Sequence, residues 1–351
     1  QTGIDLEFLT EYGLFLAKVV TIVAATVIVI IVLVAAGYKT RKSDQGHIEI
    51  QNLNENLKSV THTLRQAILP AEVFKQQVKE QKQEEKSKQK ELKKSLKKDA
   101  GKVPAKTRLY VLDFLGDMQA SAVTQLREEI TAVVSIATEK DSVLLRLESS
   151  GGLVHSYGLA ASQLMRLLDK QISLTIAIDK VAASGGYMMA CIGNKIMAAP
   201  FALLGSIGVI AQIPNFHRLL KKNDIDVDVL TAGEYKRTLT IFGENTEKGR
   251  NKAIEELEDV HTLFKNFVSE HRPQLDMDVV ATGEAWYGRR ALEKQLVDEL
   301  KTSDAFIYEQ CQECDVYHVA YVLHKSKMDR LFERISFAIN SSLERLLVPF
   351  T

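Results

Sequence analysis

The sequence has few cysteines, and their number and spacing exclude a disulfide framework. The 351 residues contain three, namely Cys191, Cys311 and Cys314. Three thiols cannot cross-link a small secreted fold, so a reducing compartment is favoured. Cys311 and Cys314 have CxxC spacing, but neither a second pair nor flanking ligands accompany them. We therefore predict no metal site, no redox role and no cofactor.

The chain also lacks an excess of charge of either sign. Lysine plus arginine and aspartate plus glutamate each number 45, and the formal net charge is zero. This balance predicts no nucleic-acid partner, because such proteins carry a basic surface. Charge is concentrated between Phe74 and Lys102, where Lys, Glu and Gln dominate without a sustained heptad. This segment is predicted to be a solvated helix or a disordered tether rather than a coiled coil, ending near Gly101 and Pro104.

One long apolar run stands near the N-terminus, at residues 14–36. Residues 19–36 are all apolar or threonine. About 20 such residues cross a bilayer, and no small-residue cleavage site follows, so we predict an uncleaved transmembrane anchor in contact with lipid. Acidic residues precede the run, and Lys39, Arg41 and Lys42 follow it. The positive-inside rule then places the C-terminal bulk in the cytoplasm.

From Arg108 onward, short apolar runs alternate with segments of helical periodicity. The runs predict strands at 109–114, 142–148, 172–179, 195–199, 226–231 and 296–300. The periodic segments predict helices at 121–138, 153–169, 187–192, 247–271 and 288–294. Repeated strand–helix units with right-handed crossovers imply a mainly parallel sheet, and hence an α/β domain.

A small-residue turn, Ala183-Ser184-Gly185-Gly186, lies between a predicted strand and a predicted helix. Such a turn exposes a hydroxyl on a tight elbow, with the amides of the helix N-terminus nearby to meet negative charge. Ser184 is therefore a candidate nucleophile. The alternative interpretation is that its hydroxyl caps the helix.

Three loops are predicted at the carboxyl ends of strands, where α/β sheets place their sites: Ser149–Gly152, Ala182–Gly186 and Gly233–Lys236. Two of them are glycine-rich, which permits close backbone approach and leaves amides free to bind an oxyanion. The third carries Lys236, which can act as a base for Ser184 if its amine is desolvated and uncharged. The alternative is an ordinary lysine in a surface loop.

The segments Asp179–Ala190, Gly205–Val209 and Gly233–Lys236 resemble, in this order, motifs of the signal peptide peptidase A family of serine peptidases. The single-length, N-terminally anchored architecture is similar to the SohB branch of that family. The resemblance extends from the anchor to about Leu300. It implies a ClpP/crotonase-like spiral of β-β-α units in a bacterial inner-membrane protein. It also implies ring or dome homo-oligomers, in which the base comes from the same or a neighbouring subunit.

The resemblance also assigns roles to residues. It implies Ser184 as the nucleophile and Lys236 as the general base of a serine–lysine dyad. The positions that match the family's oxyanion donors and substrate cleft are Gly151, Gly152, Gly185 and Ser206. Ser150 stands where the family usually has proline, but the loop amides remain. The implied activity is cleavage of peptides, or of unfolded or membrane-derived protein fragments, through an acyl-enzyme.

These observations divide the chain into five parts. They are an N-terminal tail (1–12), a transmembrane anchor (13–38), a charged linker (39–103), a peptidase domain (104–305) and a C-terminal extension with an amphipathic helix (306–351). Two other functions stay open. A crotonase-type acyl-CoA enzyme shares the spiral fold but needs no serine–lysine pair. A catalytically silent membrane scaffold needs only the anchor and the charged helix.

Overall fold

A computed structural model of the chain describes residues 11–26, 46–98 and 106–323. Residues 11–26 are helical. Among the described residues, no helix has both the length and the apolar character that crossing a membrane requires. The predicted anchor, 14–36, continues into residues outside the described ranges, and the predicted amphipathic helix of the C-terminal extension lies outside them entirely. Residues Ile48–Val322 form one compact unit, which contains the candidate site.

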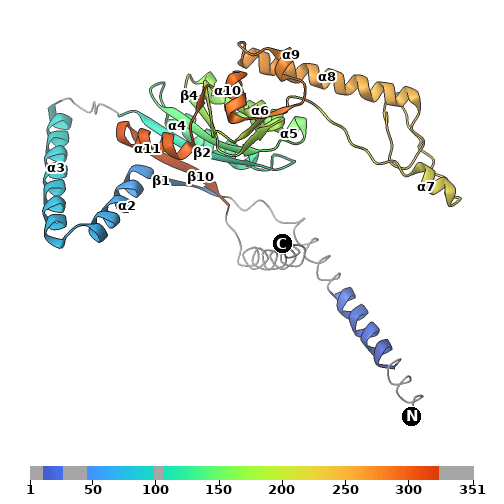
Figure 1. Cartoon of the computed structure of the whole chain (residues 1–351), viewed down its shortest axis with the longest axis horizontal. Coiled ribbons are helices and arrows are strands. Elements are labelled where there is room, and N and C mark those ends of the chain that lie inside the picture. The colour runs from blue at the N-terminus through green and yellow to red at the C-terminus, as the bar shows by residue number, and fades with distance from the viewer. Residues whose placement is uncertain (1–10, 27–45, 99–105, 324–351) are drawn as a thin grey trace. The chain divides into compact units, whose positions relative to one another are not determined.

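Within the described residues, ten strands form one sheet (Figure 1). The strands are β1 (His47–Asn52), β2 (Arg108–Gly116), β3 (Ser142–Ser149), β4 (Ser173–Ile178), β5 (Val181–Ala183), β6 (Lys195–Ala198), β7 (Leu203–Gly205), β8 (Ala285–Tyr287), β9 (Glu299–Leu300) and β10 (Asp315–Val322). Their main order is β1-β10-β2-β3-β4-β6-β9, and from β10 to β9 every pairing along it is parallel. The predicted mixed α/β fold with a mainly parallel sheet is thereby confirmed.

The sheet branches at the carboxyl end of β3. Residues Ser142–Arg146 pair with β4, whereas Ser149 pairs with Ala182 of β5. β5 then pairs with β7, and β7 pairs antiparallel with β8. The branch places the end of β5 beside the end of β3, so the two glycine-rich loops that follow these strands meet.

Helices of the same unit connect many of the strands. They are α2 (Leu53–Ile68), α3 (Ala71–Lys98), α4 (Val123–Ile136), α5 (Val154–Asp169), α6 (Gly185–Ala190), α7 (His217–Lys222), α8 (Glu247–His271), α9 (Met277–Val280), α10 (Gly288–Glu293) and α11 (Ser303–Glu313). Of these, α2–α3 and α7–α9 follow one another without a strand between them. The predicted helices at 121–138, 153–169 and 247–271 correspond to α4, α5 and α8. The predicted ends of each of these helices lie within two residues of the observed ends, because their apolar periodicity is strong.

Apolar side chains cover the sheet on both faces, because successive side chains of a strand point to opposite sides. In β2, Tyr110, Leu112 and Phe114 join the larger core, which α4, α5, α6 and α8 complete. Leu109 and Val111 alternate with these residues and point to the opposite face of the sheet. There they join a smaller core against α11 and the first turn of α2. The larger core carries the helices that hold the candidate site.

The sheet differs from the sequence prediction in two respects: one predicted strand does not form, and strands such as β1 and β10 were not predicted. The predicted strand 226–231 is wrong, since those residues pair with no strand and are exposed. Its aspartate–valine alternation suits a half-buried strand, but no neighbouring strand supplies a ladder. Conversely, β10 lies between β1 and β2, and both β1 and β10 come from beyond the predicted borders of the peptidase domain. Those borders themselves stay predictions.

Candidate active site

Ser184 occupies a sharp turn between β5 and α6. Its backbone has φ 53° and ψ −119°, a conformation that side chains with a Cβ rarely adopt. Such a conformation costs roughly 1–3 kcal/mol and persists only where the surroundings enforce it. Two hydrogen bonds do so here: the Ser184 amide donates to the Gly205 carbonyl at 2.8 Å, and the Ser184 carbonyl accepts from the Met188 amide at 3.0 Å.

The hydroxyl of Ser184 is not used to cap α6. Ser184 is the N-cap residue, but its side chain accepts no hydrogen bond from the first turn. It is only partly buried, whereas α6 itself is entirely buried. The alternative interpretation of Ser184 as a helix cap therefore loses its physical basis. A partly exposed hydroxyl at the start of a buried helix is the arrangement expected of a nucleophile on an elbow.

The glycine loop after β3 lies against this elbow. Gly151 has a φ of 89°, and a Cβ at its position would stand 2.8 Å from the Ser184 Cβ and 2.8 Å from the Gly185 amide nitrogen. Only glycine permits so close an approach in this conformation. The structure thus brings together Ser184, Gly185 and the loop that carries Gly151 and Gly152, as the sequence predicted.

The amides at the elbow differ in what they are bonded to. The Gly151 amide donates to the hydroxyl of Ser149 at 3.0 Å. In the described part of the chain, the amides of Gly152 and Gly185 donate to no acceptor. Gly185 is the first residue of α6, and the first amides of a helix have no partner within it. The Gly185 amide next to Ser184 and the Gly152 amide of the adjoining loop are therefore free, whereas the Gly151 amide, the third predicted donor, is already engaged.

Sequence reasoning assigned no role to two residues of this site, Ser149, which it placed in the glycine loop, and Tyr157. Their hydroxyl oxygens lie 2.5 Å apart, and the Tyr157 hydroxyl also donates to the Asp117 carbonyl at 2.7 Å. Ser149 is 2 % exposed and Tyr157 is fully buried. No sequence signal reveals the pair, because it depends on the end of β3 meeting the first turn of α5.

Ser206 lies on the other side of the elbow. It follows Gly205, whose carbonyl binds the Ser184 amide, and it is half-buried. Its own φ is 51°, and its amide donates to the Glu284 carbonyl at 2.6 Å. The bond from Ser184 to Gly205 attaches the turn after β7 to the elbow, and the bond from Ser206 to Glu284 attaches it to the segment that leads into β8. The pairing of β5 with β7 thus places Ser206 near Ser184.

Lys236 is located differently. It is exposed, and its loop follows no strand, because the predicted strand at 226–231 does not form. In the described part of the chain, its amine forms no hydrogen bond or ion pair, either with Ser184 or with another residue. The single chain therefore supplies the nucleophile and the glycine amides at one place, but no desolvated environment for the predicted base.

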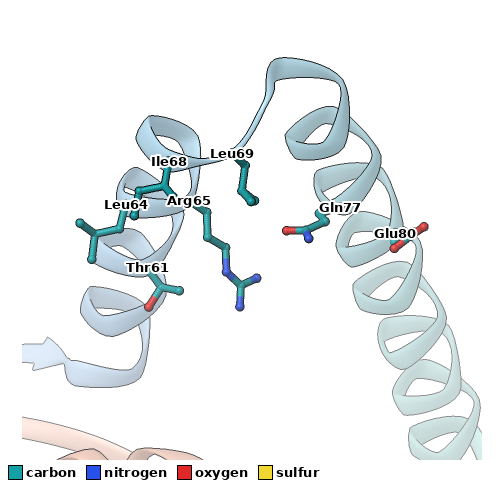
Figure 2. A pocket seen from close by; sticks show the side chains of 7 residues that line it. All are labelled: Thr61, Leu64, Arg65, Ile68, Leu69, Gln77 and Glu80. Atoms are coloured by element: carbon teal, nitrogen blue, oxygen red, sulfur yellow. The ribbon is translucent and has the colours of Figure 1, made fainter.

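Two other hollows contain none of the predicted site residues. A groove of about 650 Å³ lies between α2 and α3, where Arg65 and Leu69 extend into the space between the helices (Figure 2). Its other lining residues are Thr61, Leu64, Ile68, Gln77 and Glu80. A second hollow, of about 380 Å³, lies at the carboxyl ends of β2, β3 and β4, on the face of the sheet that bears α11.

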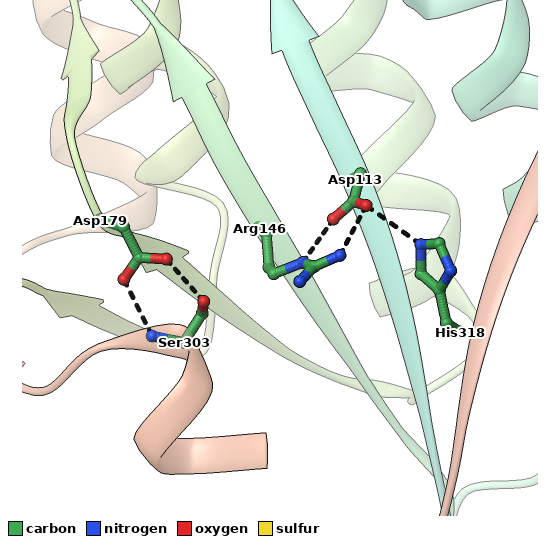
Figure 3. Close-up of polar contacts among 5 residues, drawn as sticks. All are labelled: Asp113, Arg146, Asp179, Ser303 and His318. Atoms are coloured by element: carbon green, nitrogen blue, oxygen red, sulfur yellow. Dashed lines mark hydrogen bonds and ion pairs between the residues drawn. The ribbon is translucent and has the colours of Figure 1, made fainter. Parts of the chain in front are cut away.

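Charged side chains line this second hollow (Figure 3). Arg146 binds Asp113 through two hydrogen bonds of 2.5 and 2.7 Å, and His318 binds the same carboxylate at 3.0 Å. Partial burial raises the pKa of Asp113, but the bonds from His318 and Arg146 outweigh it and hold the pKa at about 2. Asp179 accepts from the amide and hydroxyl of Ser303 at 2.9 and 2.5 Å. Asp179 thus holds the start of α11 and has no bond to Lys236.

No group of three or more metal-ligating side chains forms in the ranges that the structure describes. At the elbow itself, the structure provides a serine hydroxyl next to the free Gly185 amide and against the glycine loop. Such an arrangement is suited to acyl transfer, because the amides stabilise the negative charge that develops on the carbonyl oxygen under attack.

Comparison with known proteins identifies the family of the chain. Residues 7–164 match the N-terminal domain of Peptidase family S49, and residues 166–316 match Peptidase family S49. A "Probable protease SohB" of Haemophilus influenzae is 53% identical over 321 residues, covering 91% of each chain. The chain belongs to peptidase family S49. As a member of S49, it is a protease by family, and the predicted resemblance to the SppA-like peptidases is confirmed.

A second curated relative matches almost the whole chain. The "Probable protease SohB" of Buchnera aphidicola subsp. Acyrthosiphon pisum is 44% identical over 341 residues, covering 97% of this chain and 98% of that protein. Among solved structures, a 1510-N membrane-bound stomatin-specific protease in complex with a substrate peptide is 15% identical, with a TM-score of 0.41, and covers 66% of this chain and 98% of that one.

Proposed function

We propose that this S49 protease is a serine endopeptidase in which Ser184 is the nucleophile and Lys236 the general base. The observation that carries the proposal is the elbow itself. A partly exposed hydroxyl stands in a strained backbone conformation, is not used as a helix cap, and lies beside the free Gly185 amide and the glycine loop, whose Gly152 amide also lacks an acceptor. The ClpP/crotonase-like spiral is part of the same proposal, and the branching of the sheet after β3 supports it.

The proposed mechanism has two steps. Lys236 removes the Ser184 proton, the alkoxide attacks the peptide carbonyl, and the amine product leaves with a proton returned by Lys236. Water then attacks the acyl-enzyme, Lys236 accepts a proton from the water, and the carboxylic acid product departs as Ser184 is regenerated. In both steps, the free amides of Gly152 and Gly185 bind the oxyanion. Ser206 lines the substrate cleft.

The proposal includes the membrane. Residues 14–36 act as a single-pass anchor in a bacterial inner membrane, which the uninterrupted apolar composition of residues 19–36 supports. The basic residues that follow the run favour a cytoplasmic catalytic domain. An anchored protease meets peptides and unfolded or membrane-derived protein fragments at the bilayer, and we propose these as its substrates.

The proposal also includes a homo-oligomer. Lys236 is exposed and unpaired in the described part of the chain, whereas a lysine base must be desolvated to be neutral. Contact with a second copy would supply the missing desolvation. Whether Lys236 then acts on Ser184 of its own subunit or of its neighbour is a separate question, which the activity of mixed oligomers answers.

Two substitutions test the dyad. Ser184→Ala is expected to abolish hydrolysis of a peptide library and labelling by a serine-reactive acylating probe, while the fold and membrane insertion persist. Lys236→Arg is expected to abolish turnover as well, because a guanidinium does not deprotonate in proteins. The matched control is Ser162→Ala, which removes an exposed hydroxyl that bonds only to the Gly158 carbonyl of its own helix.

The outcomes separate the possible functions. Full hydrolysis by Ser184→Ala would remove Ser184 from the mechanism, and turnover by Lys236→Arg would exclude Lys236 as the base. A wild-type protein that neither cleaves peptides nor takes up the probe would match the silent scaffold. Binding of an acyl-CoA without peptide hydrolysis would match the crotonase-type alternative, which no feature of the site favours.

A further inference from the structure

A chain of buried hydrogen bonds runs away from the glycine loop. The Gly151 amide donates to the Ser149 hydroxyl at 3.0 Å, and the Ser149 hydroxyl lies 2.5 Å from that of Tyr157. Tyr157 gives its single proton to the Asp117 carbonyl at 2.7 Å, so Ser149 must donate to Tyr157. Every donor and acceptor in this relay from Gly151 to Asp117 is thereby assigned. Burial raises the pKa of Tyr157, which keeps its hydroxyl protonated as a donor.

Tyr157 also contacts the second glycine of the elbow. A Cβ placed on Gly185 would come within 2.9 Å of the Tyr157 Cβ and closer still to its ring. On its other side the ring packs edge-on against Phe114, with the ring centroids 6.4 Å apart. The end of β2 leaves room for the hydroxyls, since a Cβ on Gly116 would stand 2.5 Å from both Ser149 Oγ and Tyr157 Oη. The side chain of Tyr157 is therefore fixed from three directions.

We propose that Tyr157 and Ser149 are positioning residues for the oxyanion site. The relay engages the Gly151 amide and fixes the loop, so that Gly152 and not Gly151 provides the loop's donor. The ring of Tyr157 fixes Gly185, which provides the other donor. One buried tyrosine thus sets both proposed donors of the oxyanion site. This inference rests on the proposed peptidase mechanism, and it deepens that mechanism by assigning two residues that the sequence did not indicate.

The physical reason is preorganisation. An amide stabilises an oxyanion only if it already points at the place where the charge develops, and removal of one such donor lowers kcat about 10²- to 10³-fold. A donor that is displaced rather than removed loses part of that effect. A substrate held by other contacts keeps its affinity meanwhile, so the loss falls on kcat and not on KM.

The test uses the full-length protein and a fluorogenic peptide cleaved by the wild type but not by Ser184→Ala. Tyr157→Phe keeps the ring and removes the hydroxyl, and Ser149→Ala removes the middle of the relay. Each is expected to lower kcat about ten- to fifty-fold with little change in KM, since the oxyanion donors move while substrate contacts persist. The double variant is expected to be no slower than the slower single variant, because both substitutions break one chain.

The matched control is Tyr187→Phe. Tyr187 is also fully buried, and its hydroxyl donates to the Leu296 carbonyl at 2.9 Å, away from the glycine loop. The variant Tyr187→Phe loses a buried hydroxyl and one hydrogen bond to a carbonyl, as Tyr157→Phe does. It is therefore expected to lower the free energy of unfolding to a similar extent but to keep the wild-type kcat. A kcat for Tyr157→Phe equal to that of Tyr187→Phe, or effects of Tyr157→Phe and Ser149→Ala that add in the double variant, would overturn the proposal.

Hydrogen exchange of residues 149–152 tests the relay without turnover. The Gly151 amide is expected to exchange slowly in the wild type and in Tyr187→Phe, and at least tenfold faster in Ser149→Ala and Tyr157→Phe, because opening the relay exposes the amide. Equal exchange in all four proteins would refute the relay whatever the activity. If the wild type lacked Ser184-dependent hydrolysis but the exchange behaved as expected, the proposed peptidase mechanism would fail while the relay stood.

Discussion

At the scale of single residues, Glu129 on α4 is a carboxyl group held in an apolar environment. It is 5 % exposed, its Oε1 accepts from the Tyr321 amide at 2.8 Å, and its Oε2 has no partner in the described structure. Burial is the main cause that raises the pKa of Glu129, to about 7, against the lowering effect of the bond from Tyr321. Folding therefore favours the protonated form of this side chain near neutral pH.

A pH-dependent loss of stability follows from Glu129. The pKa of Glu129 in the folded protein lies above its value in the unfolded chain. The stability that the protonated side chain contributes to the fold is therefore fully present below about pH 4.5 and is lost as pH rises through about 7. Glu129→Gln removes that dependence. We expect the variant to gain stability relative to the wild type between pH 5 and pH 8, approaching about 3 kcal/mol. Urea unfolding at four pH values measures the gain.

The control for this prediction is the adjacent residue. Glu128→Gln changes the same chemical group at an exposed position on the same helix, and its free energy of unfolding should follow the pH dependence of the wild type. If the stability difference between Glu129→Gln and the wild type stayed constant from pH 5 to pH 8, the buried, protonated state of Glu129 would be disproved.

At the scale of elements, one asparagine connects α2, α11 and β10. The Asn54 amide nitrogen donates to the carbonyls of Cys311 and Cys314, both at 2.9 Å, and its oxygen accepts from the Val316 amide at 2.7 Å. These bonds satisfy backbone groups at the end of α11 and at the start of β10. The first turn of α2 is thereby attached to the strand that joins β1 to the sheet.

Loss of this attachment should be measurable. Asn54→Ala leaves three partly buried backbone groups without a partner, and we expect a loss of about 2–3 kcal/mol in the free energy of unfolding. Hydrogen exchange should accelerate in β1 and β10 more than in β3, which lies inside the sheet. Asn56→Ala serves as the matched control, since Asn56 is exposed on the same helix. Equal stabilities of the two variants would contradict the role given to Asn54.

At the scale of the whole molecule, the segment that carries Lys236 exposes large apolar side chains. Ile210 is 86 % exposed, Leu230 94 % and Phe242 51 %. A protein seldom leaves such groups in water unless a partner covers them. Because Lys236 lies within the same segment, we expect a neighbouring copy to cover this segment and to bring the neighbour's Ser184 beside Lys236.

Mixed oligomers test this expectation. Ser184→Ala and Lys236→Ala are each expected to be inactive alone, because each lacks one member of the dyad. Co-expressed in equal amounts, they should regain about one quarter of the wild-type activity, since one random pairing in four joins an intact serine to an intact lysine across an interface. Peptide hydrolysis by the purified mixture measures the recovery. An inactive mixture of co-assembled subunits would place both members of the dyad in one subunit.

The comparison of sequence and structure shows which kinds of information are local. Helix α8 was predicted at its observed bounds because its apolar periodicity over 25 residues has no competing interpretation. The strand at 226–231 was wrong because an alternating pattern predicts a strand only if a partner strand is available, and none is. Strand β10 was missed because its place between β1 and β2 depends on pairing with residues about 200 positions away.

The candidate site shows the same division. Ser184 and the glycine loops were predicted because small residues at the ends of strands have few other uses. The sequence did not predict the roles of Ser149 and Tyr157, nor the bond that engages the Gly151 amide. These features depend on which donor meets which acceptor across β3 and α5. The sequence by itself determined most helices, the elbow and the family, because periodicity and motif order are properties of neighbouring residues. Only the tertiary structure decided which amides are free beside Ser184, because hydrogen-bond partners are set by packing between segments distant in the chain.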